Sequence, residues 1–303
     1  MGVFKIEGGH TLKGSITPQG AKNEALQVLC AVLLTDQKVT IHNIPDIQDV
    51  NKLISLLENL GVKIQKLGKG TYSFQADDIN IDYLKSESFH TEGQALRGSI
   101  MIVGPLLTRF GVGYIPKPGG DKIGRRRLDT HFDGFIKLGA HFEYDENNFT
   151  YSVVAEKLKG SYMLLEEASV TGTSNIIMAA VLAEGTTTIY NAACEPYVQQ
   201  LCRMLNAMGA DIQGIGSNLV TIKGVERLEG CTHTILPDMI EIGSWIGLAA
   251  MTRSEITIKN VGWEHLGIMP TIFQKLGITF EKKNDDIHIP AHTNGYEIQN
   301  YID

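Results

Sequence analysis

The stretch LLENLGVKI (residues 56–64) ends an amphipathic run at a glycine and continues as an alternating run. A glycine just past the last helical turn favours the left-handed C-cap conformation, and alternation after it is typical of a strand. The signature returns in GFIKLGAHF (134–142), MLNAMGADI (204–212) and IFQKLGITF (272–280). The four glycines, Gly61, Gly139, Gly209 and Gly277, are spaced by 78, 70 and 68 residues, which indicates a repeated unit.

The segments that precede each signature repeat as well. An apolar helix is predicted over 23–34, 92–107, 173–183 and 241–251, and a β-rich strand over 38–44, 186–192 and 255–261. Each unit therefore reads as helix, strand, helix, strand, strand, with a leading strand before it. The first helix is apolar nearly all round, so we expect it to be buried. Such units cannot bury both faces alone, and we predict an α/β fold in which they pack around a shared axis.

Composition narrows the class of protein. A length of 303 residues suggests two domains, and a net charge of −7 argues against broad nucleic-acid binding. No apolar run approaches the roughly 20 residues that span a bilayer, and the N-terminus lacks the pattern of a signal peptide. The four cysteines are far apart without a CxxC, and the nine histidines lack ligand-like spacing. We expect reduced thiols, a cytoplasmic protein and no metal site.

The starts of the apolar helices predict where chemistry occurs. Helix N-termini gather positive potential and unpaired N–H groups, so anions bind there. The four starts are polar or contain glycine: TPQGAKNEA (17–25), FHTEGQALR (89–97), ASVTGTSN (168–175) and LPDMIEIG (236–243). If the units share an axis, Lys22, Asn23, Arg97 and the residues before the third helix converge on one cleft. Asp238 heads the fourth helix, where a helix cap and a site role are about equally favoured.

The stretch KPGGDKIGRRRLD (117–129) is the sharpest candidate for an anion site. Pro118, Gly119 and Gly120 make a flexible loop with available amides, and Asp121 is its single acid before the arginines. Guanidinium groups suit phosphate or carboxylate. A solvated basic loop is the alternative for any charge run, but the glycines, the lone acid and the helix starts favour a polyanion site. The cations are Lys117, Lys122, Arg125, Arg126 and Arg127.

Six motifs together resemble a known family. They are GAKNEALQVL (20–29), LRGSIMIVGPLLTRFG (96–111), PGGDKIGRRRLD (118–129), SVTGT (169–173), LAEGTT (182–187) and LPDMIEIG (236–243). In consistent order from about Phe4 to Asp303, the chain resembles the UDP-N-acetylglucosamine 1-carboxyvinyltransferase family of enolpyruvyl transferases. The sister family of 5-enolpyruvylshikimate-3-phosphate synthases shares the repeat but not the PGG loop, and it is the alternative enzyme.

The resemblance implies an inside-out α/β barrel with two domains of three units each. It implies a transferase of peptidoglycan synthesis in the cytoplasm that moves enolpyruvyl from phosphoenolpyruvate to the 3′-hydroxyl of UDP-N-acetylglucosamine. The reaction passes through a tetrahedral ketal and needs no metal or organic cofactor. These small-molecule substrates would be the partners, with no nucleic acid or membrane.

The matched motif positions imply roles for individual residues. Lys22 would contact phosphoenolpyruvate and take part in catalysis, Asn23 would contact both substrates, and Arg97 the nucleotide sugar. Arg126 would grip phosphate, and Asp121 would be the proton donor at a position usually held by a reactive cysteine. The nucleotide-sugar site would be lined by Arg127, Leu128, Asp129, Thr130, Ser169, Val170 and Thr171.

Three departures from the family pattern have consequences. Arg127 replaces the usual proline, which changes the local backbone and charge. An aspartate ionises near pH 4, so Asp121 needs desolvation and the substrate's charge to raise its pKa in the closed enzyme. Without the thiol, we expect resistance to the epoxide fosfomycin.

The number of repeats is the third departure, since four are present where the family has six. Residues 22–229 would form a complete domain, and residues 1–21 plus 230–303 a partial one that exposes the apolar helix 241–251. This leaves open whether the chain alone completes the transfer, and a nucleotide-sugar-binding fragment without catalysis is the alternative outside enzymes.

Overall fold

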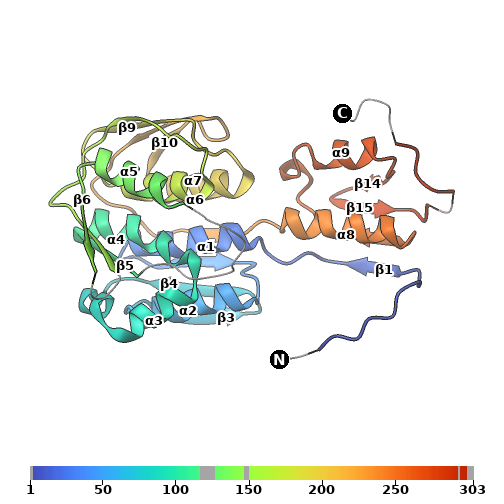
Figure 1. The fold of residues 1–303 in the computed structure, drawn as a ribbon, viewed down its shortest axis with the longest axis horizontal. Helices are drawn as coiled ribbons and strands as arrows, with labels where there is room; N and C mark the ends of the chain where they lie inside the picture. Colours follow the sequence, from blue (N-terminus) through green and yellow to red (C-terminus); the bar gives the residue numbers. More distant parts are fainter. Residues whose placement is uncertain (1–2, 117–126, 147–149, 293, 299–303) are drawn as a thin grey trace. The chain divides into compact units, whose positions relative to one another are not determined.

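The computed structural model describes residues 3–116, 127–146, 150–292 and 294–298, and the chain forms two compact units (Figure 1). Unit 2 is Lys22–Ile235, and unit 1 combines Met1–Ala21 with Leu236–Asp303. Across the described residues, no helix combines the length and the apolar character that a membrane crossing requires.

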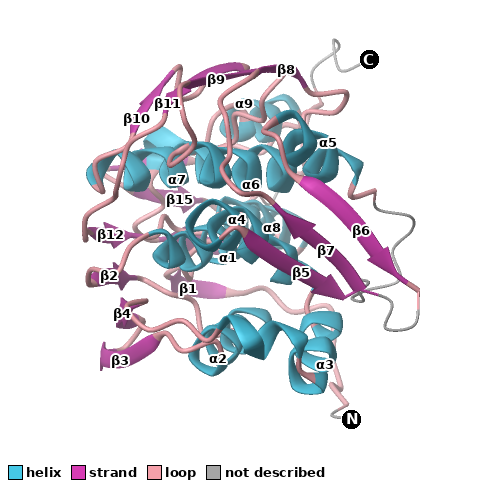
Figure 2. Ribbon diagram, turned by 90° about the vertical axis from the view of Figure 1, so that its left-hand side faces the viewer, coloured by secondary structure: helices cyan, strands magenta, loops and turns pink. Residues whose placement is uncertain are grey.

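The strands of unit 2 form three sheets on the outside of the unit (Figures 1 and 2). The first contains β12 (Thr232–Thr234), β2 (Val39–His42), β4 (Thr71–Gln75) and β3 (Lys63–Gly68), in that order. The second contains β8 (Tyr162–Leu164), β9 (Thr186–Tyr190), β11 (Leu219–Lys223) and β10 (Asp211–Gln213), and the third contains β5 (Val112–Pro116), β7 (Thr150–Val154) and β6 (His141–Asp145). In the first two, a leading strand pairs in parallel with the first strand of the repeat, and the others follow antiparallel.

Apolar helices fill the centre of unit 2 and contact one another (Figure 2). They are α1 (Lys22–Ala31) with the 3₁₀ turn η1 (Val32–Leu34), the 3₁₀ turn η3 (Arg97–Ile102) with α4 (Val103–Phe110), and α6 (Val170–Ala180). Every residue of α6 from Gly172 onward is buried. The burial predicted for these helices is confirmed, and it follows from the lack of a polar face.

The second apolar segment is not the single helix expected over 92–107. It is divided into α3 (Glu87–Ala95), η3 and α4, and Leu96 between the first two has extended backbone with φ −136° and ψ 112°. A proline has no N–H to donate and fits an α-helix only in its first turn. Pro105 is the third residue of α4, so a regular α-helix cannot continue through it from residue 92. The 3₁₀ turn η2 (Ile81–Lys85) precedes α3.

The amphipathic helices end as the repeated glycines predict. They are α2 (Gln48–Asn59), α5 (Asp129–Lys137) and α7 (Pro196–Ala207) in unit 2, and α9 (Met269–Lys275) in unit 1. The glycine after each has positive φ: 107° at Gly61, 95° at Gly139, 101° at Gly209 and 82° at Gly277. A strand begins a few residues after every one of these glycines. The C-cap prediction is therefore confirmed at all four positions.

Unit 1 contains one further copy of the repeat. Its sheet has the order β1 (Lys13–Ile16), β13 (Glu255–Ile258), β15 (Asp286–Ile289) and β14 (Glu281–Lys283), with β1 parallel to β13. The helix α8 (Met239–Met251) buries Ile242, Ile246 and Ala249 against this sheet, whereas Met251 is 88% exposed. The short turn η4 (Trp263–His265) precedes α9.

An asparagine after the first strand of three repeats was not recognised from the sequence. Asn43, Asn191 and Asn260 all have positive φ, at 59°, 61° and 53°. In unit 2, the Asn43 amide donates to the carbonyl of Ile235 and the Asn191 amide to that of Leu165, both at 2.9 Å. Each bond joins the strand end to the chain just after the leading strand, a role that asparagine can take because it tolerates the left-handed region.

Candidate active site

The starts of several helices of unit 2 meet at one cavity of about 800 Å³. Lys22 and Asn23 begin α1, Arg97 begins η3, and Ser169 precedes α6. A volume of this size suits a small-molecule ligand. The lining residues are Lys22, Asn23, Leu26, Gln48, Asp49, Lys52, Ala95, Leu96, Arg97, Gly98, Ile100, Arg127, Leu128, His131, Glu167, Ser169 and Thr171.

The start of α6 is shaped by a cap and a close approach. Ser169 is the N-cap, and its hydroxyl oxygen accepts from the backbone N–H of Gly172 at 3.1 Å. A Cβ at Gly172 would lie 2.7 Å from Cγ2 of Thr130, so only glycine lets α6 approach α5 this closely. The sequence SVTG therefore places the N-terminus of α6, with its positive end, beside α5 at the cavity wall.

Cations outnumber carboxylates in the cavity. Lys22, Lys52, Arg97 and Arg127 line it, against Asp49 and Glu167. Lys22 pairs with Asp49 at 2.5 Å, with both side chains about 40% exposed, so the pair contributes little to stability. The excess of positive charge, together with the helix N-termini, attracts anions.

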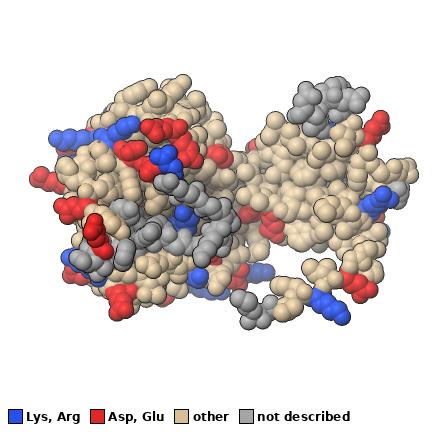
Figure 3. Space-filling model, in the orientation of Figure 1, with Lys and Arg blue, Asp and Glu red and all other residues tan. Residues whose placement is uncertain are grey.

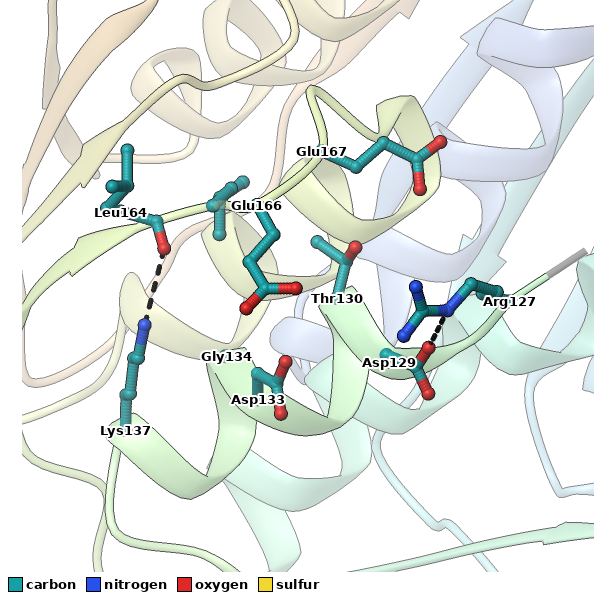
Figure 4. Close-up of a pocket in the computed structure, with 10 residues that line it drawn as sticks. Arg127, Asp129, Thr130, Asp133, Gly134, Lys137, Leu164, Glu166 and Glu167 are labelled. Carbon is teal, nitrogen blue, oxygen red and sulfur yellow. Dashed lines mark hydrogen bonds and ion pairs between the residues drawn. The ribbon is translucent and has the colours of Figure 1, made fainter.

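A second, smaller cavity of about 160 Å³ lies beside α5 (Figure 4). Figure 4 shows the carboxylates of Asp133 and Glu166 pointing into the same space, with Arg127 paired to Asp129 at one side. Figure 3 shows acidic and basic side chains side by side on the face of unit 2 that is in view. Four carboxylates line this cavity, so it is unfavourable for an anion, and the larger cavity is the candidate site. Its charged residues are Arg127, Asp129, Asp133, Lys137, Glu166 and Glu167.

Buried polar residues of unit 2, one of which lines the cavity, were not predicted from the sequence. His131 of α5 is 2% exposed, and burial, with the nearby charge of Arg97, lowers its pKa to about 3. Glu24 of α1 is fully buried, and Nε2 of His233 on β12 lies 2.8 Å from its carboxylate. The sequence signal for such residues is polarity inside apolar helices, at Glu24 and at Ser174-Asn175.

The structure brings some of the predicted site residues together in one cavity and places the others elsewhere. One cavity brings together Lys22, Asn23, Arg97, Arg127, Leu128, Ser169 and Thr171. Asp129 and Thr130 line the smaller cavity, whereas Val170, the first residue of α6, lines neither. Asp121 and Arg126 lie outside the described residues. Asp238 is the N-cap of α8 in unit 1 and accepts from the N–H of Ile240 at 2.9 Å, which is the capping role. Among the described residues, no group of three or more His, Cys, Asp or Glu could hold a metal ion.

Comparison with known proteins tests the family. The pattern of the EPSP synthase family (3-phosphoshikimate 1-carboxyvinyltransferase) matches residues 6–301. A UDP-N-acetylglucosamine 1-carboxyvinyltransferase of Bacteroides thetaiotaomicron is 63% identical over 303 residues, which cover all of this chain and 70% of that protein. The enzyme of that name from Porphyromonas gingivalis is 59% identical, with the same coverage of both chains.

Solved structures test the fold. The enolpyruvyl transferase NikO from Streptomyces tendae has a TM-score of 0.79 at 19% identity, covering 95% of this chain and 68% of its own. EPSP synthase from Acinetobacter baumannii has a TM-score of 0.69 at 19% identity, covering 94% and 66%. The predicted fold of repeated α/β units is confirmed by these likenesses, and the predicted family by the sequence matches. The chain therefore belongs to the enolpyruvyl transferase family.

Proposed function

We propose that the chain is a UDP-N-acetylglucosamine 1-carboxyvinyltransferase, which transfers enolpyruvyl from phosphoenolpyruvate to the 3′-hydroxyl of UDP-N-acetylglucosamine and releases phosphate. This is the first committed step of peptidoglycan synthesis. The observation that carries the proposal is the 59–63% identity, over the whole chain, with proteins of that name. The shikimate-pathway alternative is supported more weakly, because the structural likeness to EPSP synthase comes with only 19% identity.

The larger cavity is suited to the charges of these substrates. Phosphoenolpyruvate carries a phosphate and a carboxylate, and the nucleotide sugar carries a diphosphate. Fixed cations and helix N-termini stabilise such groups without reorganising during the reaction. We assign Lys22 and Asn23 to phosphoenolpyruvate, with Asn23 also at the sugar, and Arg97 to the nucleotide sugar. Arg127, Leu128, Ser169 and Thr171 line the larger cavity and complete the nucleotide-sugar site there, whereas Asp129, Thr130 and Val170, which the resemblance also assigns to that site, do not line this cavity.

The reaction adds a proton to the methylene carbon of phosphoenolpyruvate and later removes a proton from the same carbon. The 3′-hydroxyl loses its proton as its oxygen bonds to C2 of phosphoenolpyruvate, and the methylene carbon gains a proton, which gives a ketal. The ketal then loses phosphate and one methyl proton, which restores the double bond. Asp121 would donate the first proton and Arg126 would bind the phosphate; both lie outside the described residues.

Two further assignments belong to the proposal. The division into a three-repeat domain, predicted as 22–229, and a one-repeat domain, predicted as 1–21 plus 230–303, is supported by the three sheets of unit 2 and the single sheet of unit 1, with the boundary moved to after Ile235 because β12 pairs with β2. A cytoplasmic location is supported by the four cysteines, all of which are unpaired.

Calorimetry and phosphate release test the function on the 303-residue chain. We expect UDP-N-acetylglucosamine to bind and shikimate 3-phosphate not to bind. Phosphate release that requires both phosphoenolpyruvate and the nucleotide sugar would establish transfer. Nucleotide-sugar binding without release would instead favour a binding fragment, and binding of shikimate 3-phosphate alone would favour the alternative enzyme.

A pair of lysine variants tests the cavity itself. Lys22→Met removes a cation at the cavity, and loss of a hydrogen bond to a charged group should weaken phosphoenolpyruvate binding about 10- to 100-fold. Lys157→Met is the matched control, because Lys157 is also an exposed lysine of unit 2 in an ion pair, with Glu184, but does not line this cavity. Equal affinities in the two variants would show that the site lies elsewhere.

A further inference from the structure

A series of hydrogen bonds runs from the core of unit 2 to the wall of the candidate active site. Its inner member is Asn175 of α6, which is fully buried. The amide oxygen of Asn175 accepts from the backbone N–H of Gly104 at 2.8 Å, and its amide nitrogen donates to the carbonyl of Ile100 at 2.9 Å. A backbone N–H can only donate and a backbone carbonyl can only accept. The main chain therefore determines which way the Asn175 amide points.

The amide in turn determines the tautomer of His131. The Asn175 nitrogen has a second hydrogen to donate, and it lies 3.1 Å from Nδ1 of His131. Nδ1 must then accept, so it carries no proton, and a neutral ring carries its proton on Nε2. A doubly protonated ring would set an N–H against the amide hydrogens. Burial and the charge of Arg97 also lower the pKa of His131, which favours the neutral ring.

The outer member of the series is Thr171, an exposed residue of the cavity wall. Nε2 of His131 lies 3.2 Å from its hydroxyl oxygen, and because Nε2 carries the proton, that oxygen accepts. Among the described residues, the Thr171 hydroxyl has no other hydrogen-bond partner. We propose that His131 is a positioning residue that presents the Thr171 hydroxyl as a hydrogen-bond donor to an acceptor oxygen of the bound nucleotide sugar.

Close packing between α5 and α6 keeps this arrangement rigid. A Cβ at Gly134 of α5 would lie 2.3 Å from Cδ1 of Ile176, so the two helices meet without a side chain between them. The packing therefore holds the ring and the hydroxyl close to each other, while the Asn175 amide sets which of them donates. A phosphoryl or carbonyl oxygen of the ligand accepts the hydroxyl proton, whereas a group that can only donate would leave that proton unpaired.

Binding measurements on four variants test the proposal, which rests on the function proposed above. Thr171→Val should weaken binding of UDP-N-acetylglucosamine about tenfold or more, whereas Thr171→Ser, which keeps the hydroxyl, should stay within about twofold of the original chain. His131→Leu should weaken it similarly, and His131→Gln, which again offers a donor and an acceptor, should recover part of the loss. A role in folding alone would not produce this recovery.

The double variant Thr171→Val/His131→Leu separates a shared role from two independent ones. If His131 acts through Thr171, the double variant binds no more weakly than Thr171→Val alone. Losses that multiply, or a Thr171→Val variant that binds as tightly as the original chain, would overturn the proposal. If the original chain does not bind the nucleotide sugar at all, the proposed function fails first.

A spectroscopic arm is independent of the substrate. The ¹⁵N chemical shifts of the imidazole nitrogens distinguish the two neutral tautomers, and His131→Gln identifies the signals of this ring among the nine histidines. A proton on Nε2 supports the proposed positioning whether or not UDP-N-acetylglucosamine binds. A proton on Nδ1 would overturn it.

Discussion

Acid should destabilise the folded chain through His131. The ring is 2% exposed, and burial with the charge of Arg97 lowers its pKa from 6.5 to about 3. As the pH falls through about 6.5, the ring of the unfolded chain binds a proton, whereas the folded chain keeps it neutral until about pH 3. The neutral ring therefore contributes stability that is complete above pH 6.5 and is lost as the pH falls toward 3.

The size of the effect follows from the gap between the two pKa values. At pH 4.5 the unfolded ring is two pH units below its pKa, and each unit corresponds to about 1.4 kcal/mol. This single group should therefore lower the free energy of unfolding by about 3 kcal/mol between pH 7 and pH 4.5. His131→Gln cannot titrate, so its stability should fall by about 3 kcal/mol less over the same range.

Urea unfolding followed by circular dichroism at both pH values measures this difference. The carboxylates titrate in both proteins and cancel when the pH-dependent losses are compared. His141→Gln, which makes the same substitution at an exposed position on β6, is the matched control. If the original chain and His131→Gln lose the same stability, the folded ring titrates normally, and the reasoning from its burial is wrong.

Three further predictions follow from burial and packing. Gly134→Ala should destabilise the chain by about 1–3 kcal/mol, because its Cβ would overlap Ile176. In Gly247→Ala of α8 the new Cβ meets open space, so this variant should raise the melting temperature slightly. Equal shifts of the melting temperature in both variants would contradict this prediction. In the native chain a thiol reagent should modify the exposed Cys194 first and reach Cys30 and Cys202 only on unfolding. Both of these thiols are buried, and burial raises the pKa of Cys202 to about 12. Early labelling of Cys202 would show that the core is open to the reagent. Fosfomycin should leave the mass of the chain unchanged, since position 121 is aspartate, and a covalent adduct within 117–127 would refute this.

The local features of the fold could be predicted because each depends on a few neighbouring residues. A glycine after an amphipathic run was enough to predict the left-handed caps at Gly61, Gly139, Gly209 and Gly277, since only glycine takes that conformation without cost. Pro105 indicated in the same way that no regular α-helix runs through all of 92–107, although hydrophobicity alone suggested one helix; the extended backbone at Leu96 is a separate break that Pro105 does not indicate. For Asp238, the sequence favoured a helix cap and a site role about equally. The hydrogen bond from the N–H of Ile240 shows that it is the cap.

The buried polar pairs of unit 2 could not be predicted from the sequence, because the two partners of each pair are far apart in the chain. His131 and Asn175 are 44 residues apart, and Glu24 and His233 are 209 residues apart. No pattern in one segment indicates such a pair, since its energy arises only after the helices have packed and water has left.

The amino-acid sequence by itself determined the repeat, its caps and strands, and the family to which the chain belongs. The convergence of the starts of α1, η3 and α6 was predicted from the repeat, but the tertiary structure alone decided that cations outnumber carboxylates in their cavity and that His131 is neutral beside Thr171. The physical reason is the distance along the chain over which each effect acts. Backbone preferences are set by residues within a turn or two, whereas the charge and tautomer of a buried ring depend on donors, acceptors and desolvation supplied by other helices.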